Sequence, residues 1–332
     1  MEILETILPE IFLSISIMFL LLFGVFKNNS YKIVYKLTIL ILFFSILLVL
    51  NQVDKNFLIF NDSFIVDDLS FYIKNLILIS TIAVLLISKD YLIILKLENF
   101  EYPILILSSI LGMFIMVSSN DLIVFYMGLE LQSLPLYVLA TFNKKSIKST
   151  EAGLKYFVLS ALSSGLFLYG CSLIYGLSGT TNFYLIASSL NPSDLGILLG
   201  IVFIIVALSF KISLVPFHMW TPDVYEGAPT SVTSFFALVP KVAGIGVFIR
   251  FMFVPLINVL SEWQTILIFL SIASMILGSV AAIGQTNIKR LMAYSSIGHM
   301  GYALAGIATG TNQGIKSTII YITIYLIMNI GI

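Results

Sequence analysis

Long apolar stretches separated by short polar connections run through the whole chain. A helix needs about 17–25 predominantly apolar residues to cross a bilayer, and stretches of that length recur from one end to the other. We predict helices at about 7–26, 31–50, 67–88, 103–119, 121–142, 151–176, 195–221, 230–253, 262–284, 289–309 and 314–332. The pattern therefore predicts an all-α, polytopic transmembrane helix bundle with about 11 helices in this chain.

The seventh stretch, 195–221, combines unusual length with a charge and a proline. Lys211 lies inside it, and a lysine near the bilayer centre costs roughly 2.5–3.5 kcal/mol on insertion scales. Pro216 has no N–H and displaces the carbonyl of Ile212, four residues earlier. Broken backbone at membrane depth needs protein or water around it. We therefore predict a broken seventh helix made of two half-helices.

The longest connections, around 51–66, 89–102 and 177–194, carry Asn, Asp, Ser and Gly, and we expect them to be surface loops. Within the last of these, residues 179–183 contain turn and strand formers and favour a short hairpin. No soluble domain interrupts the series of apolar stretches, so we expect one membrane domain.

Composition supports an integral membrane protein and excludes several function classes. Hydrophobic residues make up 59% of the chain and charged residues 10%, and the mean hydropathy is +1.06, whereas about a quarter of a soluble protein is charged. The formal net charge is zero and no basic run is long, so no nucleic-acid partner is expected.

Redox and nucleotide chemistry are not expected on this chain. Cys171 is the only cysteine, and His218 and His299 are the only histidines. These residues cannot form a disulfide, a thiolate cage or an imidazole metal site. The sequence also lacks glycine-rich nucleotide loops. We expect no cofactor, and any linked redox step must occur on another chain.

Lysine and arginine sort unevenly between the connections. Odd-numbered connections are flanked by Lys27, Lys32, Lys36, Lys89, Lys96, Lys144, Lys145, Lys148, Lys289 and Arg290, and even-numbered ones hold Lys55, Arg250 and Lys316. By the positive-inside rule, the N-terminus lies outside and this chain's C-terminus inside.

The first apolar stretch is expected to be a retained helix. Glu2 and Glu5 precede it instead of positive charges, and its length does not fit a cleaved signal peptide. Heavy use of Ile, Lys, Asn, Phe and Tyr indicates an AT-rich genome. We therefore expect the mitochondrial inner membrane, with a bacterial plasma membrane as the alternative.

Three ionisable residues fall near the middle of predicted spans, and each has a proline nearby. They are Glu130 before Pro135, Lys211 before Pro216, and Lys241 directly after Pro240. Each proline frees a carbonyl that can bind water or an ammonium group. Ionisable groups at one depth are typical of a proton relay, and buried lysine titrates readily.

The alternative is a structural ion pair between Glu130 and Lys211 that holds two helices together. A buried pair adds little stability because desolvation roughly cancels the Coulomb gain. Such a pair would also leave Lys241 without an acid partner. We therefore favour the relay.

Four further polar residues are candidates with competing explanations. Lys155 lies one turn into the sixth span, four residues after Glu151, and either joins the relay or snorkels to the interface. For Lys74 the interfacial explanation is favoured. His218 and His299 could pass a proton near neutral pH or only hydrogen-bond a neighbouring helix, and the functional role is favoured for His218.

Small residues in two spans are expected to serve helix packing. Gly196 and Gly200 are four residues apart, and residues 160–165 form a Ser/Gly-rich run. Small side chains let neighbouring backbones approach closely in a membrane. We assign both sets to packing and not to chemistry.

Several motifs in order resemble the antiporter-like membrane subunits of respiratory complex I. The central one is Phe210-Lys211-Ile212-Ser213-Leu214-Val215-Pro216-Phe217-His218-Met219-Trp220-Thr221-Pro222-Asp223, and 224–230, 151–157, 287–297 and 8–13 agree with it. Within that family the sequence is similar to NADH–quinone oxidoreductase chain 2. Chains 4 and 5 have a histidine at the position of Lys241 and usually Trp-Leu-Pro-Asp-Ala at 220–224.

The resemblance implies a fourteen-helix fold with two inverted five-helix repeats. It assigns 1–102 to helices 1–3 with their loops, 103–253 to the first repeat and 254–332 to an incomplete second repeat, with the last three family helices missing. Either the chain is a fragment or a separate polypeptide supplies those helices. The implied partners are other membrane-arm subunits, including the other antiporter-like chains, and membrane lipids.

Three functions remain open on the sequence. The favoured one is a proton-translocating subunit of complex I that uses Glu130, Lys211 and Lys241, with electron transfer from NADH to quinone on other subunits. The second is a subunit of a cation/proton antiporter that works without electron transfer. The third is a structural membrane-arm subunit that no longer pumps.

Overall fold

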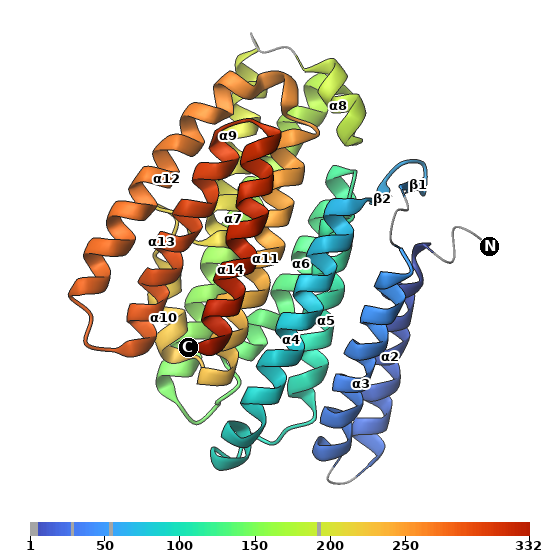
Figure 1. Ribbon diagram of the computed structural model, residues 1–332, viewed down its shortest axis with the longest axis vertical. Helices are drawn as coiled ribbons and strands as arrows, with labels where there is room; N and C mark the ends of the chain where they lie inside the picture. Colours follow the sequence, from blue (N-terminus) through green and yellow to red (C-terminus); the bar gives the residue numbers. More distant parts are fainter. Residues whose placement is uncertain (1–5, 28–29, 53–55, 191–193) are drawn as a thin grey trace.

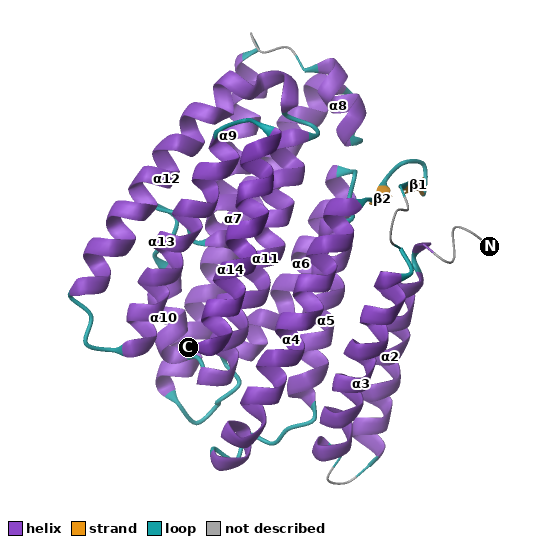
Figure 2. Cartoon of the chain, in the orientation of Figure 1, coloured by secondary structure: helices purple, strands orange, loops and turns teal. Residues whose placement is uncertain are grey.

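The computed structural model describes residues 6–27, 30–52, 56–190 and 194–332. The long helices run side by side along the long axis of the molecule (Figure 1), and very little of the described chain is strand (Figure 2). Glu2, Glu5 and Lys55, which were used above for the first segment and the charge distribution, lie outside the described residues, as do residues 191–193 of the loop at 177–194.

Each predicted apolar stretch contains a long helix. These are α2 (Leu8–Phe26), α3 (Tyr31–Leu50), α4 (Asp68–Ile94), α5 (Glu101–Val117), α6 (Leu122–Ala140), α7 (Ile147–Ser178), α9 (Leu195–Ile212), α11 (Thr230–Phe253), α12 (Leu260–Ile283), α13 (Ile288–Ala308) and α14 (Asn312–Gly331). Within the described residues, nine helices are long and apolar enough to cross a membrane, and α5 is a shorter apolar helix. The predicted polytopic all-α bundle is confirmed.

Two of the connections differ from the expected loops. Helix α4 continues to Ile94, into a stretch that we assigned to a loop. The connection at 51–66 contains an antiparallel pair, β1 (Phe57–Ile59) and β2 (Phe64–Val66). Its turn places Asn61 and Asp62 at φ 53° and 62°, a left-handed conformation that these two residue types tolerate.

The hairpin predicted at 179–183 is wrong. A short helix, α8 (Phe183–Ser189), begins there instead. Asn182 is its N-cap, and its side-chain oxygen accepts hydrogen bonds from the backbone N–H groups of Tyr184 and Leu185. This capping satisfies free donors of the first turn and so favours a helix over a strand.

The break in the seventh predicted span is confirmed. Helix α9 ends at Ile212, Ser213 adopts a left-handed conformation with φ 64°, and a second half-helix, α10, covers Trp220–Gly227. Protein groups satisfy the backbone around the break: Val215 N–H donates to Ser274 Oγ at 2.9 Å, and Trp220 Nε1 donates to the Phe210 carbonyl at 3.0 Å.

Helix α11 lies at the centre of the bundle. Of its most apolar 18-residue window, 83% is buried, and it packs against α4, α5, α9, α10, α13 and α14. A short 3₁₀ turn at Ile257–Val259 links it to α12. Arg250, which we counted with a connection, lies buried in the last turn of α11. Lys241 is therefore carried by the most enclosed helix.

Close helix contacts occur where small residues meet. A Cβ at Gly200 on α9 would lie 3.1 Å from the Gly170 carbonyl oxygen on α7, which supports the packing role predicted for Gly200. On α5, a Cβ at Gly112 would lie 2.2 Å from the backbone nitrogen of Gln132 on α6. These contacts let α7 and α9, and separately α5 and α6, approach each other closely.

Candidate functional site

Lys211 lies in the last turn of α9, directly before the break. Its ammonium nitrogen donates hydrogen bonds to Ser133 Oγ on α6 at 2.7 Å and to Ser160 Oγ on α7 at 2.8 Å. The Tyr137 hydroxyl, also on α6, donates to Ser160 Oγ at 2.5 Å. A cluster of hydroxyl groups from two helices therefore holds this lysine.

Glu130 lies on α6 one turn before Ser133. Its Oε1 atom is enclosed and has no hydrogen-bond partner in the part of the chain that the structure describes. No direct ion pair joins this carboxyl group to Lys211 among the described residues. The structural ion pair considered from the sequence is absent from this structure, and hydroxyl groups bind the lysine instead.

Lys241 lies in the middle of α11 and is only 1% exposed. Its side-chain nitrogen hydrogen-bonds to Ser213 Oγ at the break and lies 5.5 Å from the centroid of the Trp220 ring. The Thr221 hydroxyl donates to Ser213 Oγ at 2.6 Å. The break between α9 and α10 therefore supplies the polar and aromatic surroundings of this second lysine.

The prolines near the three charges act differently from one another. Pro135 and Pro240 lie inside the continuous helices α6 and α11, whereas Pro216 lies within the interrupted segment. The observed partners of Lys211 and Lys241 are serine hydroxyls and not carbonyls freed by proline. Among the described residues, no carbonyl freed by these prolines accepts a hydrogen bond from either lysine, and binding of water by those carbonyls stays a prediction.

The two histidines have different surroundings. His218 lies in the interrupted segment and is buried, and its Nδ1 has no hydrogen-bond partner among the described residues. His299 lies on α13, and its Nδ1 is 2.7 Å from the Tyr321 hydroxyl of α14. The His299 ring also lies beside the rings of Tyr302 and Tyr325. His218 is thus close in sequence to the lysine sites, whereas His299 belongs to an aromatic cluster on the last two helices.

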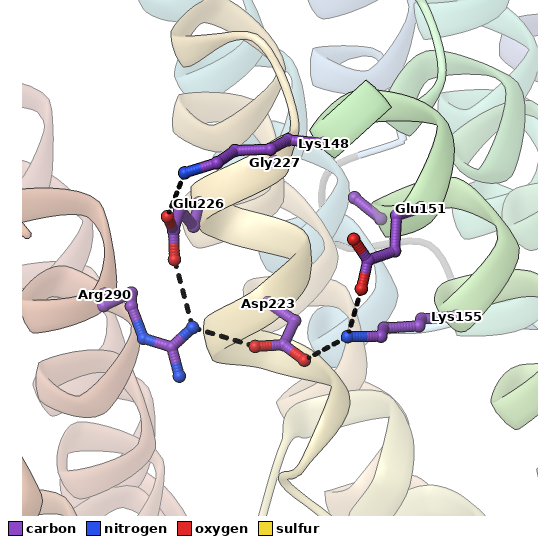
Figure 3. Close-up of a pocket in the computed structure, with 8 residues that line it drawn as sticks. Lys148, Glu151, Lys155, Asp223, Glu226, Gly227 and Arg290 are labelled. Atoms are coloured by element: carbon purple, nitrogen blue, oxygen red, sulfur yellow. Dashed lines mark hydrogen bonds and ion pairs between the residues drawn. The ribbon is translucent and has the colours of Figure 1, made fainter. Parts of the chain in front are cut away.

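Lys155 is part of a surface ion-pair cluster. It contacts Asp223 at 2.8 Å and Glu151 at 2.7 Å, and Figure 3 shows Asp223 between Lys155 and Arg290. The remaining pairs are Arg290–Asp223 at 2.9 Å, Arg290–Glu226 at 3.0 Å and Lys148–Glu226 at 2.9 Å. Together they tie α10 to α7 and to α13 around a cavity of about 160 Å³.

The two acids of α10 are ionised at neutral pH. Partial burial alone would raise the pKa of the Asp223 carboxyl, but hydrogen bonds and charges from Lys155 and Arg290 lower it below its ordinary value. Hydrogen bonds from Lys148 and Arg290 lower the pKa of Glu226. Because both acids stay charged, the cluster fixes the position of the second half-helix.

Lys74 forms a separate buried pair. It is 0% exposed and contacts Glu10 Oε1 on α2 at 2.6 Å. Its nitrogen also lies 5.5 Å from the ring centroids of Phe64 and Phe114. The interfacial, snorkelling position favoured from the sequence is wrong, because the first helices enclose the lysine together with its acid partner.

Sequence reasoning missed most of the partners of the charged residues. Ser160 was assigned to packing, yet it binds Lys211 across 51 residues of sequence. Ser133, Ser213 and Thr221 gave no signal of their own, although Ser213 and Thr221 lie in the motif that carried the resemblance. Asp223 lies in that motif as well, and a motif-based search for charge partners could have found it.

The helix order, the interrupted span and the buried lysines define an antiporter-like membrane fold. The family model described as NADH:quinone oxidoreductase/Mrp antiporter, transmembrane, matches residues 119–332. The chain belongs to this family. In sequence it is 63% identical to NADH-quinone oxidoreductase subunit N of Pelagibacter ubique over 332 residues, covering 100% of this chain and 70% of the relative.

Further relatives agree with this assignment. Subunit N of Bartonella bacilliformis is 54% identical, and the match covers 98% of this chain and 68% of that protein. In structure, a chain of respiratory complex I from Thermus thermophilus superposes with a TM-score of 0.84 at 31% identity, covering 97% of this chain and 68% of that one. The Pelagibacter and Bartonella relatives are bacterial and are named subunit N, whereas we named the branch chain 2.

The same fold also occurs in a different kind of assembly. A chain of the Mrp complex from Dietzia sp. DQ12-45-1b superposes with a TM-score of 0.86 at 20% identity, covering 98% of this chain and 63% of that one. At that identity the likeness shows the fold alone.

Proposed function

We propose that this chain is a proton-translocating membrane-arm subunit of an NADH:quinone oxidoreductase in a bacterial plasma membrane. The observation that carries the proposal is the half-buried Lys211 and the buried Lys241 at one broken helix, in a chain closely related to subunit N proteins. The bacterial relatives favour the plasma membrane over the mitochondrial inner membrane that we expected.

Glu130, Lys211 and Lys241 form the proposed relay. Glu130 lies on α6 one turn before Ser133, whose hydroxyl binds Lys211. Approach of the carboxylate stabilises the ammonium form of Lys211, and its withdrawal favours release of the proton. Lys241 receives that proton within the most enclosed helix of the bundle. In this proposal Lys211 is the switch, and Glu130 sets its state.

The remaining candidates have secondary roles in this proposal. His218 lies in the interrupted segment and serves as a further proton-passing group there. Lys155 holds α10 in place through Asp223 and acts on the relay only through that half-helix. His299, hydrogen-bonded to Tyr321, would connect the relay to the helices of the second repeat. The division into repeats at 103–253 and 254–332 remains a prediction.

Electron transfer is assigned to partner subunits. The only cysteine of the chain is Cys171, and the proposal places no redox centre or cofactor here. Partners of this chain would be other membrane-arm subunits and, by the proposal, membrane lipids. The proton relay and the redox reaction would therefore be coupled across subunit boundaries.

A native gel tests whether the chain works in such a complex. Membranes are extracted in mild detergent, the gel is stained for NADH oxidation, and proteins that migrate with the chain are identified by mass spectrometry. We expect migration with NADH-oxidising flavin and iron–sulfur subunits. A companion polypeptide with three further helices in the same band would identify a divided subunit.

The matching family model is described by both NADH:quinone oxidoreductase and Mrp antiporter, which makes cation/proton antiport the second candidate function. Sodium-dependent proton flux in vesicles supplied with neither NADH nor quinone would support it, particularly if the chain migrates without NADH-oxidising activity. A purely structural role predicts instead that removing the charge of Lys211 impairs assembly and leaves coupling unchanged in the complexes that do assemble.

A further inference from the structure

Two buried hydroxyl groups connect Lys241 to both halves of the broken helix. Ser213, the C-cap of α9, hydrogen-bonds to the lysine nitrogen, and Thr221, in the first turn of α10, donates to Ser213 at 2.6 Å. Both residues are 0% exposed. Any change at Lys241 therefore reaches α9 and α10 through one pair of hydroxyls.

The hydrogen-bonding capacity of lysine changes with its charge. An ammonium group has three donors and no acceptor, so Ser213 must accept from it. A neutral amine has a lone pair and can accept the Ser213 proton. A hydroxyl carries one proton and rotates to suit its neighbours, so Ser213 cannot donate to both Lys241 and Thr221 at once.

We propose that Ser213 and Thr221 are positioning residues for proton transfer at Lys241, because their shared hydrogen bond reverses direction with the charge of the lysine. With a neutral lysine, Thr221 donates to Ser213 and Ser213 donates to the amine. With an ammonium group, Ser213 accepts from the lysine and turns its own proton to Thr221. This inference rests on the proposed function.

Two covalent bonds change in this scheme. An N–H bond of the Lys211 ammonium breaks, the released proton forms an N–H bond at Lys241, and the two hydroxyls rotate and keep their own protons. Because Thr221 belongs to the first turn of α10, the charge of Lys241 alters the hydrogen bonding of the half-helix that the ion-pair cluster holds in place. The hydroxyl pair thereby links the relay to the break.

No charged side chain forms an ion pair or hydrogen bond with Lys241 among the described residues. Titratable groups lie on each of the six helices packed against α11: Asp68, Tyr72, Lys74, Lys89, Asp90 and Tyr91 on α4, Glu101 and Tyr102 on α5, Lys211 on α9, Asp223, Tyr225 and Glu226 on α10, Lys289, Arg290, Tyr294, His299 and Tyr302 on α13, and Lys316, Tyr321 and Tyr325 on α14. Lys74 is paired with Glu10, Asp223 with Lys155 and Arg290, and His299 with Tyr321. Ser213 is thus the side chain placed to respond first to a change in the charge of Lys241.

The test measures proton translocation against NADH oxidation as a function of pH, with the assembled complex in proteoliposomes. Ser213→Gly removes the hydroxyl and suits the left-handed backbone at this position. A buried ammonium without its partner binds its proton less well, so the alkaline limb of pumping moves to lower pH. We expect a shift of about one to two pH units, since each unit is a tenfold change in protonation.

Thr221→Val keeps the shape of the side chain and removes the group that accepts from Ser213. We expect a smaller shift in the same direction, about half a unit to one unit. Thr221→Ser restores the hydroxyl and should return the profile to that of the wild type. Ser209→Ala is the matched control, because Ser209 Oγ is buried on the same helix without a hydrogen-bond partner among the described residues.

The outcomes separate this inference from the proposed function. Lys241→Ala is measured in the same series, and normal pumping by that variant would overturn the proposed function and this inference with it. If Lys241→Ala stops pumping while Ser213→Gly and Thr221→Val keep the wild-type profile, only the hydroxyl pair is refuted. A defect in Ser213→Ala that Ser213→Gly does not share would trace the effect to backbone strain and refute it too.

Discussion

The buried pair Lys74–Glu10 gives the sharpest prediction about stability. The lysine is 0% exposed and the Glu10 side chain 6%, with 2.6 Å between the charged atoms. Removing one partner of a buried pair typically costs about 3–5 kcal/mol, because it leaves an unpaired charge without solvent. Glu10→Gln should therefore destabilise the assembled subunit strongly.

Because aromatic rings surround Lys74, we expect the loss of stability to lie near the lower end of that range. Phe64 and Phe114 remain beside the ammonium group, each at 5.5 Å, and a desolvated cation–ring contact contributes about 2 kcal/mol. We expect Glu10→Gln to cost about 3 kcal/mol, which is roughly a hundredfold change in an equilibrium constant. Glu10→Gln combined with Lys74→Met should recover most of this loss, because no charge then remains buried.

The assay follows the temperature at which the chain leaves the detergent-extracted complex, read on native gels. Lys27→Met is the matched control, since this lysine is exposed and lies 5.1 Å from the Phe23 ring, a contact that contributes about 0.5–1 kcal/mol at most. Our reasoning would be refuted if Glu10→Gln shifted the midpoint no more than Lys27→Met, or if the double variant were the least stable.

Two further predictions concern packing and pH. Gly112→Ala places a Cβ 2.2 Å from the backbone of α6, and this overpacking should destabilise the subunit by about 1–3 kcal/mol. We expect less subunit to remain in the complex after mild heating. Unchanged retention would show that the two helices separate freely. The pKa values of Asp223 and Glu226 are lowered, so their ion pairs stabilise the fold above about pH 4 and are lost as pH falls through the lowered values. Asp223→Asn should lower stability by about 1 kcal/mol per partly exposed pair, measured as a lower dissociation temperature than that of the wild type. This difference in dissociation temperature should persist from about pH 8 to 5 and vanish in stronger acid. A constant difference at all pH values would contradict the prediction.

The apolar pattern predicts the helices well because membrane spans are long and uniform. The boundaries of α11 at 230 and 253 agree with the prediction, and α9 begins at the predicted Leu195. The broken helix is also predictable, because Pro216 and Lys211 conflict with a straight span. Connections are less predictable, because the structure of short segments such as 57–66 and 183–189 depends on single turn and cap residues.

The partners of the charged residues could not be predicted in the same way. Ser133 and Ser160 lie 78 and 51 residues from Lys211 in sequence, and a serine in an apolar helix has the same local pattern whether it packs or binds. Glu10 likewise lies 64 residues from Lys74, so the sequence does not indicate that the two side chains pair. Composition and spacing indicate that charges such as Lys211 and Lys241 lie inside spans, but only the packing of the helices shows that Lys74 and Arg250 are buried and what each charge contacts.

The central claim is that Lys211 transfers protons, and the ratio of protons translocated to NADH oxidised tests it most directly. The ratio is measured in vesicles with fully assembled complex carrying Lys211→Ala, beside Lys316→Ala, which changes an exposed lysine on α14. We predict that the ratio falls in Lys211→Ala while the chain remains in the complex, and that Lys316→Ala keeps the wild-type ratio. An unchanged ratio in Lys211→Ala would contradict the proposed relay.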